Sequence, residues 1–527
     1  MKNILVVDLF AGPGGLGEGF SSYETSGQKK PFNLVLSIEK EERAHQTLEL
    51  RAFFRQFNGK APGEYYQYLQ NPSPSTRSRL FRKFPAKERE AKEQALCLEL
   101  GKDNQKIYQH IKDRLGTTDR WVLIGGPPCQ AYSLVGRSRL KGKQLSPRTR
   151  QQTGLYKEYL AVLDRYAPPV FIMENVKGLL SAKDGIVGGG NIFKKILNDL
   201  KNPEQALSGK IMETKSVEYK IFPITQNKGN SQLNFLELDP PSSSYVIKCE
   251  QFGIPQTRHR VILLGIRSDL DVLPSPLKQT HNMEEVTLWD VIANLPKIRS
   301  KTSKEEDSMP HWCKTLISAR KEPWFKSLSS KSIKKEIRKV LTNLTNLKVV
   351  SKTQNCEYKP YRGKHGKLEN WFNDKNLLNT CNHESRGHIV EDLYRYLYAA
   401  CFAIVNRVSP TLNDFPEELL PKHNNVKEAL TSSKFIDRFR VQVKGQPSTT
   451  ITSHISKDGH YYIHPDPRQC RSLTVREAAR LQTFPDNYFF EGPRTSQYVQ
   501  VGNAVPPFLA NQIAEVVFDI FKQSKLK

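Results

Sequence analysis

A cysteine and a glutamate each follow a short apolar run, where an open α/β sheet would carry its chemistry. The run 121–124 leads into the loop Gly-Gly-Pro-Pro-Cys-Gln that contains Cys129, and the run 170–173 leads into Glu174. Functional groups of such sheets gather at the carboxyl ends of the strands, so we expect these two side chains to lie close together. A thiolate can act as a nucleophile and a carboxyl group as a proton donor.

Both residues also have an ordinary structural interpretation. An isolated cysteine is more often a small buried hydrophobe than a nucleophile, and a glutamate often forms a cap or a salt bridge. Two prolines stiffen the loop before Cys129, however, and the polar residues Gln130 and Ser133 follow it, which is poor composition for a core. The uncharged run before Glu174 favours a proton donor there.

A glycine-rich turn follows the first apolar run, 4–10. Its sequence from Asp8 is Asp-Leu-Phe-Ala-Gly-Pro-Gly-Gly, and Glu39 ends the next run. Glycines let backbone N–H groups approach a ligand closely at a helix N-terminus, and an acidic residue after the second strand commonly binds ribose hydroxyls. The spacing Gly-x-Gly-x-x-Gly is not met cleanly, and no Walker lysine follows. A nucleoside cofactor without a pyrophosphate therefore fits better than a dinucleotide or ATP.

The sequence Gln-Thr-Arg-His-Arg at 256–260 opens another apolar run. In a strand, Arg258 and Arg260 would point to one face, where they could hold a phosphate or a base carbonyl. The alternative is a pair of surface charges on an edge strand.

Composition restricts the class of protein. The chain of 527 residues has a net charge of +26, and residues 297–367 alone hold 19 Lys/Arg against 6 Asp/Glu. Such a local excess favours a polyanionic partner, although a solvated basic insertion would look the same. No run approaches the ~18 apolar residues of a membrane span, and no signal peptide is indicated. The eight cysteines contain no CxxC pair, so we expect no metal and a reducing, cytoplasmic setting.

The pattern of apolar runs predicts two domains. A doubly wound parallel sheet would span residues 1–270, with a charged, largely helical insertion at about 60–118, and would be completed by the amphipathic helix within 495–527. Residues 271–494 would form a second, irregular domain, which includes a helix opened by a capping box at Thr474. The expected strands of the sheet are 4–10, 34–38, 121–124, 170–173, 245–247 and 261–266.

The order of these motifs resembles that of the DNA cytosine-5 methyltransferases. The segments that carry the resemblance are 8–15, Glu39, 125–133, the pattern Leu-Tyr-x-x-Tyr-Leu at 155–160, 174–176, 256–260, 471–484 and 502–506. The resemblance implies a class I, Rossmann-like methyltransferase sheet, with residues 271–494 as the domain that recognises a DNA target. It implies S-adenosylmethionine as cofactor, with contacts from Phe10, Ala11, Gly12, Gly14, Glu39, Pro128, Asn503 and Val505.

The resemblance also implies a covalent mechanism on a cytosine that has left the duplex. Cys129 would attack C6 while Glu174 acts at N3, and Arg258 and Arg260 would hold the base and its phosphate. The residues Gln130, Ser133, Asn175 and Gln256 would support the substrate or the loop. Double-stranded DNA is the implied partner of a monomer in the cytoplasm, associated with the nucleoid, and a cognate restriction endonuclease would complete a restriction–modification system.

Two features depart from the family pattern. The acidic motif that normally follows the third strand, and reads the adenine amino group, is not found, because the insertion at 60–118 occupies that place. The sequence Cys-Asn-His-Glu-Ser-Arg-Gly-His at 381–388 lacks the spacing of a zinc site and is interpreted as a polar loop. Residues 450–467, with His454 and His464, could face DNA.

Three alternatives remain at this point. An amino-group methyltransferase shares the fold and cofactor, but its loop needs no thiol, so Gly-Pro-Pro-Cys argues against it. A tRNA cytosine-5 methyltransferase is harder to exclude, although such relatives lack so large a recognition region. A non-catalytic DNA-binding homologue would have no need of Cys129, Glu174 and the cofactor turn together.

Overall fold

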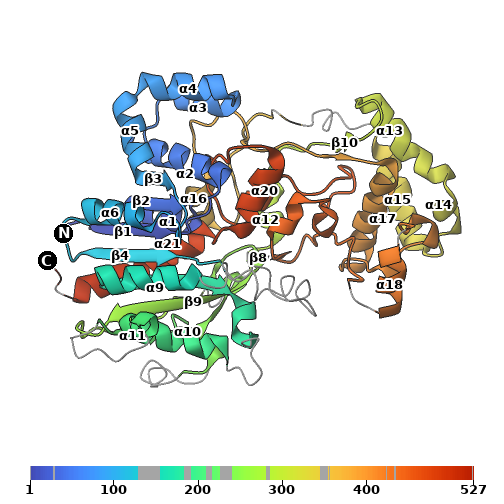
Figure 1. Cartoon of the computed structure of the whole chain (residues 1–527). Coiled ribbons are helices and arrows are strands. Elements are labelled where there is room, and N and C mark those ends of the chain that lie inside the picture. Colours follow the sequence, from blue (N-terminus) through green and yellow to red (C-terminus); the bar gives the residue numbers. More distant parts are fainter. Residues whose placement is uncertain are drawn as a thin grey trace.

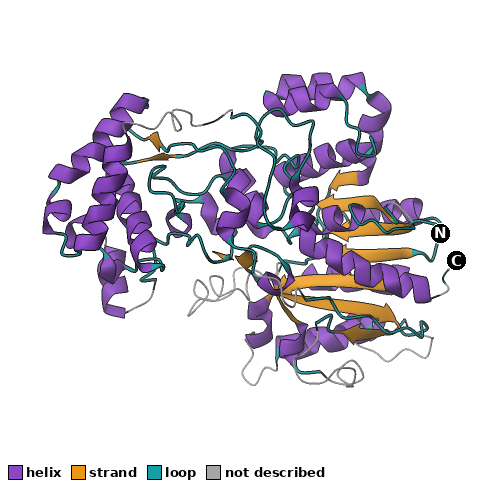
Figure 2. Cartoon of the chain, turned by 180° about the vertical axis from the view of Figure 1, so that it is seen from behind, coloured by secondary structure: helices purple, strands orange, loops and turns teal. Residues whose placement is uncertain are grey.

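The protein is built on one mixed sheet with a second region of helices and loops beside it (Figures 1 and 2). The computed structural model describes residues 2–27, 30–128, 155–182, 191–208, 217–225, 240–279, 285–344, 354, 356–422, 424–432, 435–524 and 526. Within them, an eight-stranded sheet has the order β3-β2-β1-β4-β5-β9-β6, and β7 pairs with β9. Its strands are β1 Ile4–Leu9, β2 Phe32–Glu39, β3 Ala95–Cys97, β4 Trp121–Gly125, β5 Val170–Val176, β6 Tyr219–Phe222, β7 Val246–Lys248 and β9 His259–Arg267.

The direction of the strands changes at one edge of the sheet. Strands β3, β2, β1, β4 and β5 are parallel, whereas β9 runs antiparallel to β5, β6 and β7. The carboxyl end of β5 therefore lies beside the amino end of β9. This arrangement brings two sequence motifs that are far apart in the chain to the same edge.

Helices cover both faces of the sheet, as expected for an α/β fold with buried strands. Helices α1 and α21 pack on one face through a core that includes Phe20 and Ile513. Helices α6, α9 and α10 pack on the other face around Tyr159 and Phe193. The helices of this part are α1 Gly15–Ser21, α2 Glu42–Arg55, α6 Asn104–Leu115, α9 Leu155–Tyr166, α10 Ile192–Lys201, α11 Pro203–Ser208 and α21 Pro507–Gln523.

The insertion is shorter than the sequence predicted. Three helices, α3 Gly63–Gln70, α4 Pro74–Lys83 and α5 Pro85–Gln94, follow α2, but the chain then returns to the sheet as β3 and α6. Strand β3 pairs in parallel with β2, with Cys97 opposite Glu39. The predicted stretch 60–118 thus contains the third strand and its helix, and only the helices up to residue 94 are inserted.

The inserted helices connect the sheet to the second region. The Tyr66 hydroxyl donates to Asp374 Oδ2 (2.8 Å), and the Tyr68 hydroxyl donates to Glu491 Oε1 (2.6 Å). Helices α2 to α5 also share a hydrophobic cluster with residues of the second region, among them Leu377 and Phe489. The insertion is therefore a brace between the two parts.

The second region contains two hydrophobic clusters. One lies among α13, α14, α15 and α17, around Trp312, and the other among α12, α16, α19 and α20, around Tyr498. The capping box predicted at Thr474 is confirmed, since the Thr474 hydroxyl and the Glu477 carboxylate each accept the other's backbone N–H. The elements are α12 Leu288–Ile292, β10 Lys301–Thr302, α13 Met309–Ser318, α14 Pro323–Ser327, α15 Lys331–Asn343, α16 Gly366–Phe372, β11 Gly387–His388, α17 Val390–Asn406, α18 Asn424–Ser432, β12 Ser448–Thr449, α19 Val475–Leu481 and α20 Arg494–Asn503.

The C-terminal helix α21 packs against α1, the first helix of the chain. The segment Arg494–Gln523 is long and apolar enough by composition to cross a membrane, but 67% of its most apolar window is buried inside the protein. Its second half, α21, packs on α1, which confirms the docking expected from its apolar stripe. A Cβ atom on Gly15 would lie 2.2 Å from the carbonyl oxygen of Val505, so only glycine permits this approach.

We predict that Gly15→Ala lowers the free energy of unfolding by about 1–3 kcal/mol, because the added methyl group overlaps a backbone atom that cannot move alone. Urea denaturation followed by circular dichroism measures the change. Gly63→Ala is the matched control: Gly63 also begins a helix, and within the described part of the chain nothing lies within 4 Å of its added Cβ. Equal losses in the two variants would contradict the packing argument.

Candidate functional site

The turn after β1 lies at the carboxyl edge of the sheet and has an uncommon backbone conformation. Phe10, Gly12 and Gly14 all have positive φ values, of 56°, 56° and 90°. A Cβ atom on Gly12 would meet no described atom within 4 Å, which leaves open space beside the turn. The predicted contact Ala11 is fixed by its N–H, which donates to the Ile38 carbonyl (3.0 Å).

Glu39 holds this turn from the end of β2. Its Oε2 accepts the Gly12 N–H and its Oε1 accepts the Glu41 N–H, each at 2.8 Å. Burial raises the pKa of Glu39, and the two N–H donors oppose that shift. The structure thus brings together the glycine turn and the acidic residue that the sequence assigned to one cofactor site.

The two late residues of the predicted cofactor set lie at the junction of α20 and α21. Val505 is buried, and its carbonyl oxygen approaches Gly15, the first residue of α1. Asn503 is exposed at the last position of α20. The junction therefore flanks the helix that starts at the glycine turn.

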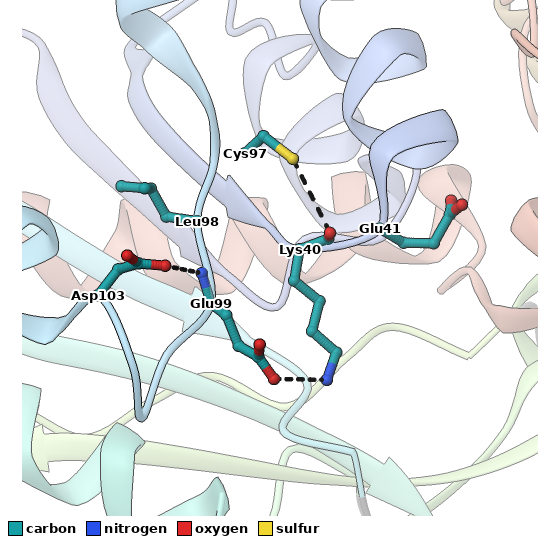
Figure 3. Close-up of a pocket in the computed structure, with 6 residues that line it drawn as sticks. All are labelled: Lys40, Glu41, Cys97, Leu98, Glu99 and Asp103. Carbon is teal, nitrogen blue, oxygen red and sulfur yellow. Dashed lines mark hydrogen bonds and ion pairs between the residues drawn. The ribbon is translucent and has the colours of Figure 1, made fainter.

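A pocket of ≈ 440 Å³ opens beyond Glu39, at the carboxyl ends of β2 and β3 (Figure 3). Lys40 and Glu41 line it from the end of β2, and the segment after β3 lines the other side. The residues of that segment are Cys97, Leu98, Glu99 and Asp103.

The acidic residues after the third strand were missed by the sequence analysis. Glu99 follows β3 by two residues and forms an ion pair with Lys40 (3.1 Å), while Asp103 Oδ2 accepts the Glu99 N–H (3.0 Å). The sequence pattern of the preceding strand could not be recognised, because β3 is only three residues long and follows the inserted helices. The Cys97 thiol donates to the Lys40 carbonyl (3.8 Å), and burial together with nearby carboxylates, Glu39 first among them, raises its pKa.

Glu174 and Arg260 form an ion pair at the edge where β5 and β9 meet. In the antiparallel register Arg260 is opposite Val176, so Glu174, two residues before Val176, is its diagonal neighbour on the same face. Arg260 Nε lies 2.8 Å from Glu174 Oε1, and both side chains keep 13% of their surface exposed. The pair is therefore oriented by the sheet and still accessible to a substrate.

The loop after β4 runs next to this pair. A Cβ atom on Gly126 would lie 3.0 Å from Glu174 Oε2, and the buried Asn175 donates through Nδ2 to the Pro127 carbonyl (3.5 Å). Pro128 is the last described residue before residue 155. The predicted residues Cys129, Gln130 and Ser133 lie outside the described residues.

Arg258 is directed away from this pair, to backbone carbonyls. Its Nη1 donates to Ile451 O (2.7 Å) and its Nη2 to Ala504 O (2.7 Å), with longer bonds to Gly502 O. The side chain is 1% exposed, and burial lowers its pKa to about 9. Arg258 thus connects the start of β9 with the second region and with the α20–α21 junction.

Gln256 has a similar connecting position. It lies in β8 Gln256–Thr257, which pairs in parallel with β12 of the second region. Its Nε2 donates to the Leu481 carbonyl and to Gln482 Oε1, and its Oε1 accepts the Ile451 N–H. The motif at 256–260 therefore splits into two connecting residues and one, Arg260, that faces Glu174.

The two histidines of the polar loop, His383 and His388, are buried. His383 contacts the Thr474 hydroxyl through Nδ1 and the Pro296 carbonyl through Nε2, and burial lowers its pKa to about 4. Burial also lowers the pKa of His464 to about 3, whereas His454 is exposed. Of the two histidines expected to face DNA, only His454 is therefore accessible.

Comparisons with known proteins agree with this geometry. A family model described as C-5 cytosine-specific DNA methylase matches residues 99–218 and 234–519. The chain is 31% identical over 541 residues to the type II methyltransferase M.Bpa9945I of Bacillus paralicheniformis, covering 98% of this chain and 99% of that one. It is 24% identical over 532 residues to the type II methyltransferase M.DdeI of Desulfomicrobium norvegicum, covering 99% and 90%. The DNA (cytosine-5-)-methyltransferase M.ApeKI of Aeropyrum pernix is 25% identical over 437 residues, covering 77% and 82%.

A buried carboxyl group lies under the glycine turn. Asp8 is fully buried in β1, and its carboxyl group lies next to Gly17, whose backbone N–H opposes the rise in the pKa of Asp8. Burial raises its pKa to about 8, and the Glu39 carboxylate acts in the same direction. The folded protein therefore keeps a proton on Asp8 at pH values where the unfolded chain has released it.

We predict that the raised pKa of Asp8 makes the free energy of unfolding fall as the pH rises. Between the ordinary Asp pKa of 3.8 and the raised value of about 8, folding takes up a proton, and each pH unit costs about 1.4 kcal/mol. Asp8→Asn removes the ionisable group, so its free energy of unfolding should depend less steeply on pH between 5 and 8. Urea denaturation across this range compares the two proteins. Parallel pH profiles would show that Asp8 does not titrate in this way.

Proposed function

The chain belongs to the C-5 cytosine-specific DNA methylase family, and we propose that it methylates C5 of a flipped-out cytosine within one specific sequence of double-stranded DNA. Its enzyme class is DNA (cytosine-5-)-methyltransferase. The observation that carries the proposal is the Glu174–Arg260 ion pair, which lies beside the loop that leads to Cys129. S-adenosylmethionine is the proposed cofactor.

The residues around the glycine turn fit this cofactor. The open space beside Gly12, the carboxylate of Glu39 and the pocket at the ends of β2 and β3 suit a nucleoside with a charged amino-acid tail. Phe10, Ala11, Gly12, Gly14, Glu39, Pro128, Asn503 and Val505 would hold it, with the adenosine end toward Leu98 and Glu99. When bound, the cofactor supplies an electrophilic methyl group on its sulfonium.

The protein's own task is to make cytosine C5 nucleophilic. The Cys129 thiolate adds to C6 while Glu174 donates a proton or hydrogen bond to N3, so the C5–C6 double bond is lost and a C4–C5 enamine forms, whose nucleophilic carbon is C5. After C5 has gained the methyl group, it loses its proton to a base. The electrons of that C–H bond reform the C5–C6 double bond and expel the Cys129 thiolate.

Arg260 has two tasks in this scheme. It keeps the Glu174 carboxyl in one orientation through the 2.8 Å contact, and its remaining N–H groups can bind the base carbonyl or the adjacent phosphate. Asn175 orients the loop after β4. We assign Arg258 and Gln256 positioning roles, because their polar groups contact backbone and Gln482 instead of open space.

The target base must leave the duplex, which costs a few kcal/mol of unstacking and unpairing. The basic second region can offset this cost through contacts with phosphates, whose strength falls steeply with salt. The named relatives are type II methyltransferases. We therefore propose that this chain works as a monomer in the cytoplasm, on the nucleoid, and protects host DNA from a cognate restriction endonuclease.

We predict that Glu39→Gln weakens the binding of S-adenosylmethionine by at least tenfold. A neutral amide accepts only one of the two backbone N–H groups, and a hydrogen bond to a charged group contributes about 1.5–3 kcal/mol. Isothermal titration calorimetry with the purified protein measures the dissociation constant. Glu42→Gln is the control, because Glu42 is an exposed residue of α2 outside the pocket. Equal affinities in the two variants would argue against the assigned ribose contact.

We predict that Cys129→Ser abolishes methyl transfer while the affinity for S-adenosylmethionine stays within twofold, because a hydroxyl is a far weaker nucleophile than a thiolate. Bisulfite sequencing of host DNA after expression of the wild type and of Cys129→Ala tests the function itself. The wild type should protect cytosines within one short motif, and the variant should protect none. A normal rate for the serine variant would rule out the covalent mechanism.

Failure of the wild type to protect DNA would have a different meaning. If the soluble protein binds S-adenosylmethionine but leaves host DNA unmethylated, the DNA substrate is wrong. Methylation of tRNA by the same preparation would then identify an RNA substrate, and no transfer to either nucleic acid would indicate a non-catalytic homologue.

A further inference from the structure

The second region carries a small basic and aromatic patch next to the strands that hold Gln256. We define this patch as Arg438, Arg440, His454 and Tyr461. His454 is exposed, and the other three side chains are partly exposed. His383 of the polar loop, by contrast, is buried and already hydrogen bonded.

Backbone hydrogen bonds join the segment that carries Arg438 and Arg440 to the segment that follows Tyr461. The Ile463 N–H donates to the Arg440 carbonyl and the Gln442 N–H donates to the Ile463 carbonyl, each at 3.0 Å. Phe439 and Val441 are 2% exposed and point into the core, so the arginines that alternate with them point outward. The segment 438–442 therefore presents its cations beside Tyr461.

His454 and Tyr461 are in contact, and both arginines act electrostatically on Tyr461. The rings of His454 and Tyr461 lie 5.7 Å apart between centroids with an interplanar angle of 69°. Arg438 and Arg440 lie near enough to the Tyr461 hydroxyl to oppose the rise in its pKa that burial causes, while Asp458 acts in the direction of burial. Arg440 is neutralised by Asp437, but Arg438 has no ion pair among the described residues.

Hydrogen bonds tie the patch to the active-site strands. The Tyr462 hydroxyl donates to the Thr450 carbonyl (3.0 Å), and the Thr450 hydroxyl donates to the Thr257 carbonyl (2.5 Å). Thr257 precedes Arg258 in the chain, and Arg260 of the same motif forms the ion pair with Glu174. The segment that carries Tyr461 is therefore connected by two hydrogen bonds to the segment that carries Arg260.

We infer that Arg438, His454 and Tyr461 bind the DNA strand that carries the target cytosine, on the nucleotides that flank it. Arg438 suits a phosphate, because its charge is not neutralised within the described residues. Tyr461, supported edge to face by His454, offers an aromatic surface for a base that has lost a stacking partner after flipping. The inference rests on the proposed function, since it requires a DNA substrate.

Fluorescence anisotropy with a labelled, unmethylated duplex tests the phosphate contact of Arg438 and the base stacking of Tyr461 separately. The duplex contains the motif in which the wild type methylates cytosine. Arg438→Gln should weaken binding and reduce the slope of log K against log salt by about 0.9 in magnitude, as expected for one lost phosphate contact. Tyr461→Ala should weaken binding about tenfold without changing that slope, and Tyr461→Phe should retain affinity. If either residue had only a structural role, the two variants would not differ in the salt dependence of binding in this way.

Controls come from a similar pair elsewhere in the chain. Arg165 lies over the ring of Tyr108 at 4.8 Å, on α9 and α6, so Arg165→Gln and Tyr108→Ala remove the same kinds of group outside the patch. Both controls should bind the duplex as the wild type does. Calorimetry with S-adenosylmethionine verifies that each variant is folded.

The outcomes separate the inference from the function on which it rests. If the wild type binds and methylates the duplex and the patch variants do so equally well, the patch is not a DNA contact and the proposed function stands. A parallel loss of affinity for S-adenosylmethionine in Arg438→Gln and Tyr461→Ala would assign these residues to folding and overturn the inference. If the wild type binds no duplex, both the function and the inference fail.

Discussion

The Arg258 guanidinium holds the parts of this molecule together. It donates to the carbonyl of Ile451 in the second region and to those of Gly502 and Ala504 at the α20–α21 junction, while its own backbone leads into β9. The group is buried, and burial lowers its pKa. Burial removes water from the charged guanidinium, and hydrogen bonds to the carbonyl groups offset this cost. All of these bonds form only when β9, the segment at Ile451 and the α20–α21 junction are in place. Arg260, two residues further on, is then placed against Glu174 by the pairing of β9 with β5.

A second constraint is the close contact between α1 and α21. Helix α21 begins after Pro506, and the carbonyl of Val505 occupies the space that a side chain on Gly15 would need. The glycine turn before α1 is therefore shaped by residues almost five hundred positions later. Glu39 fixes the other side of the same turn through the Gly12 N–H. The proposed cofactor site is thus assembled from both ends of the chain.

Local sequence signals predicted local structure well. The long apolar runs became strands, and the capping box at Thr474 formed as expected, because both depend on neighbouring residues. Strand β3 was missed, since three residues cannot show a period, and with it Glu99 and the pocket. The antiparallel direction of β9 has no local signal. The partners of Arg258 could not be predicted either, because they are backbone groups about two hundred residues away.

The brace formed by the inserted helices has a consequence for modularity. Tyr66 and Tyr68 of α3 bind Asp374 and Glu491, so the catalytic half reaches into the second region at a place separate from the β8–β12 pairing. If the second region were exchanged with that of a relative, Tyr66 and Tyr68 would lose these partners unless residues 63–94 were exchanged as well. The structural unit to exchange is therefore discontinuous in the chain and includes the helices α3 to α5, which precede β4.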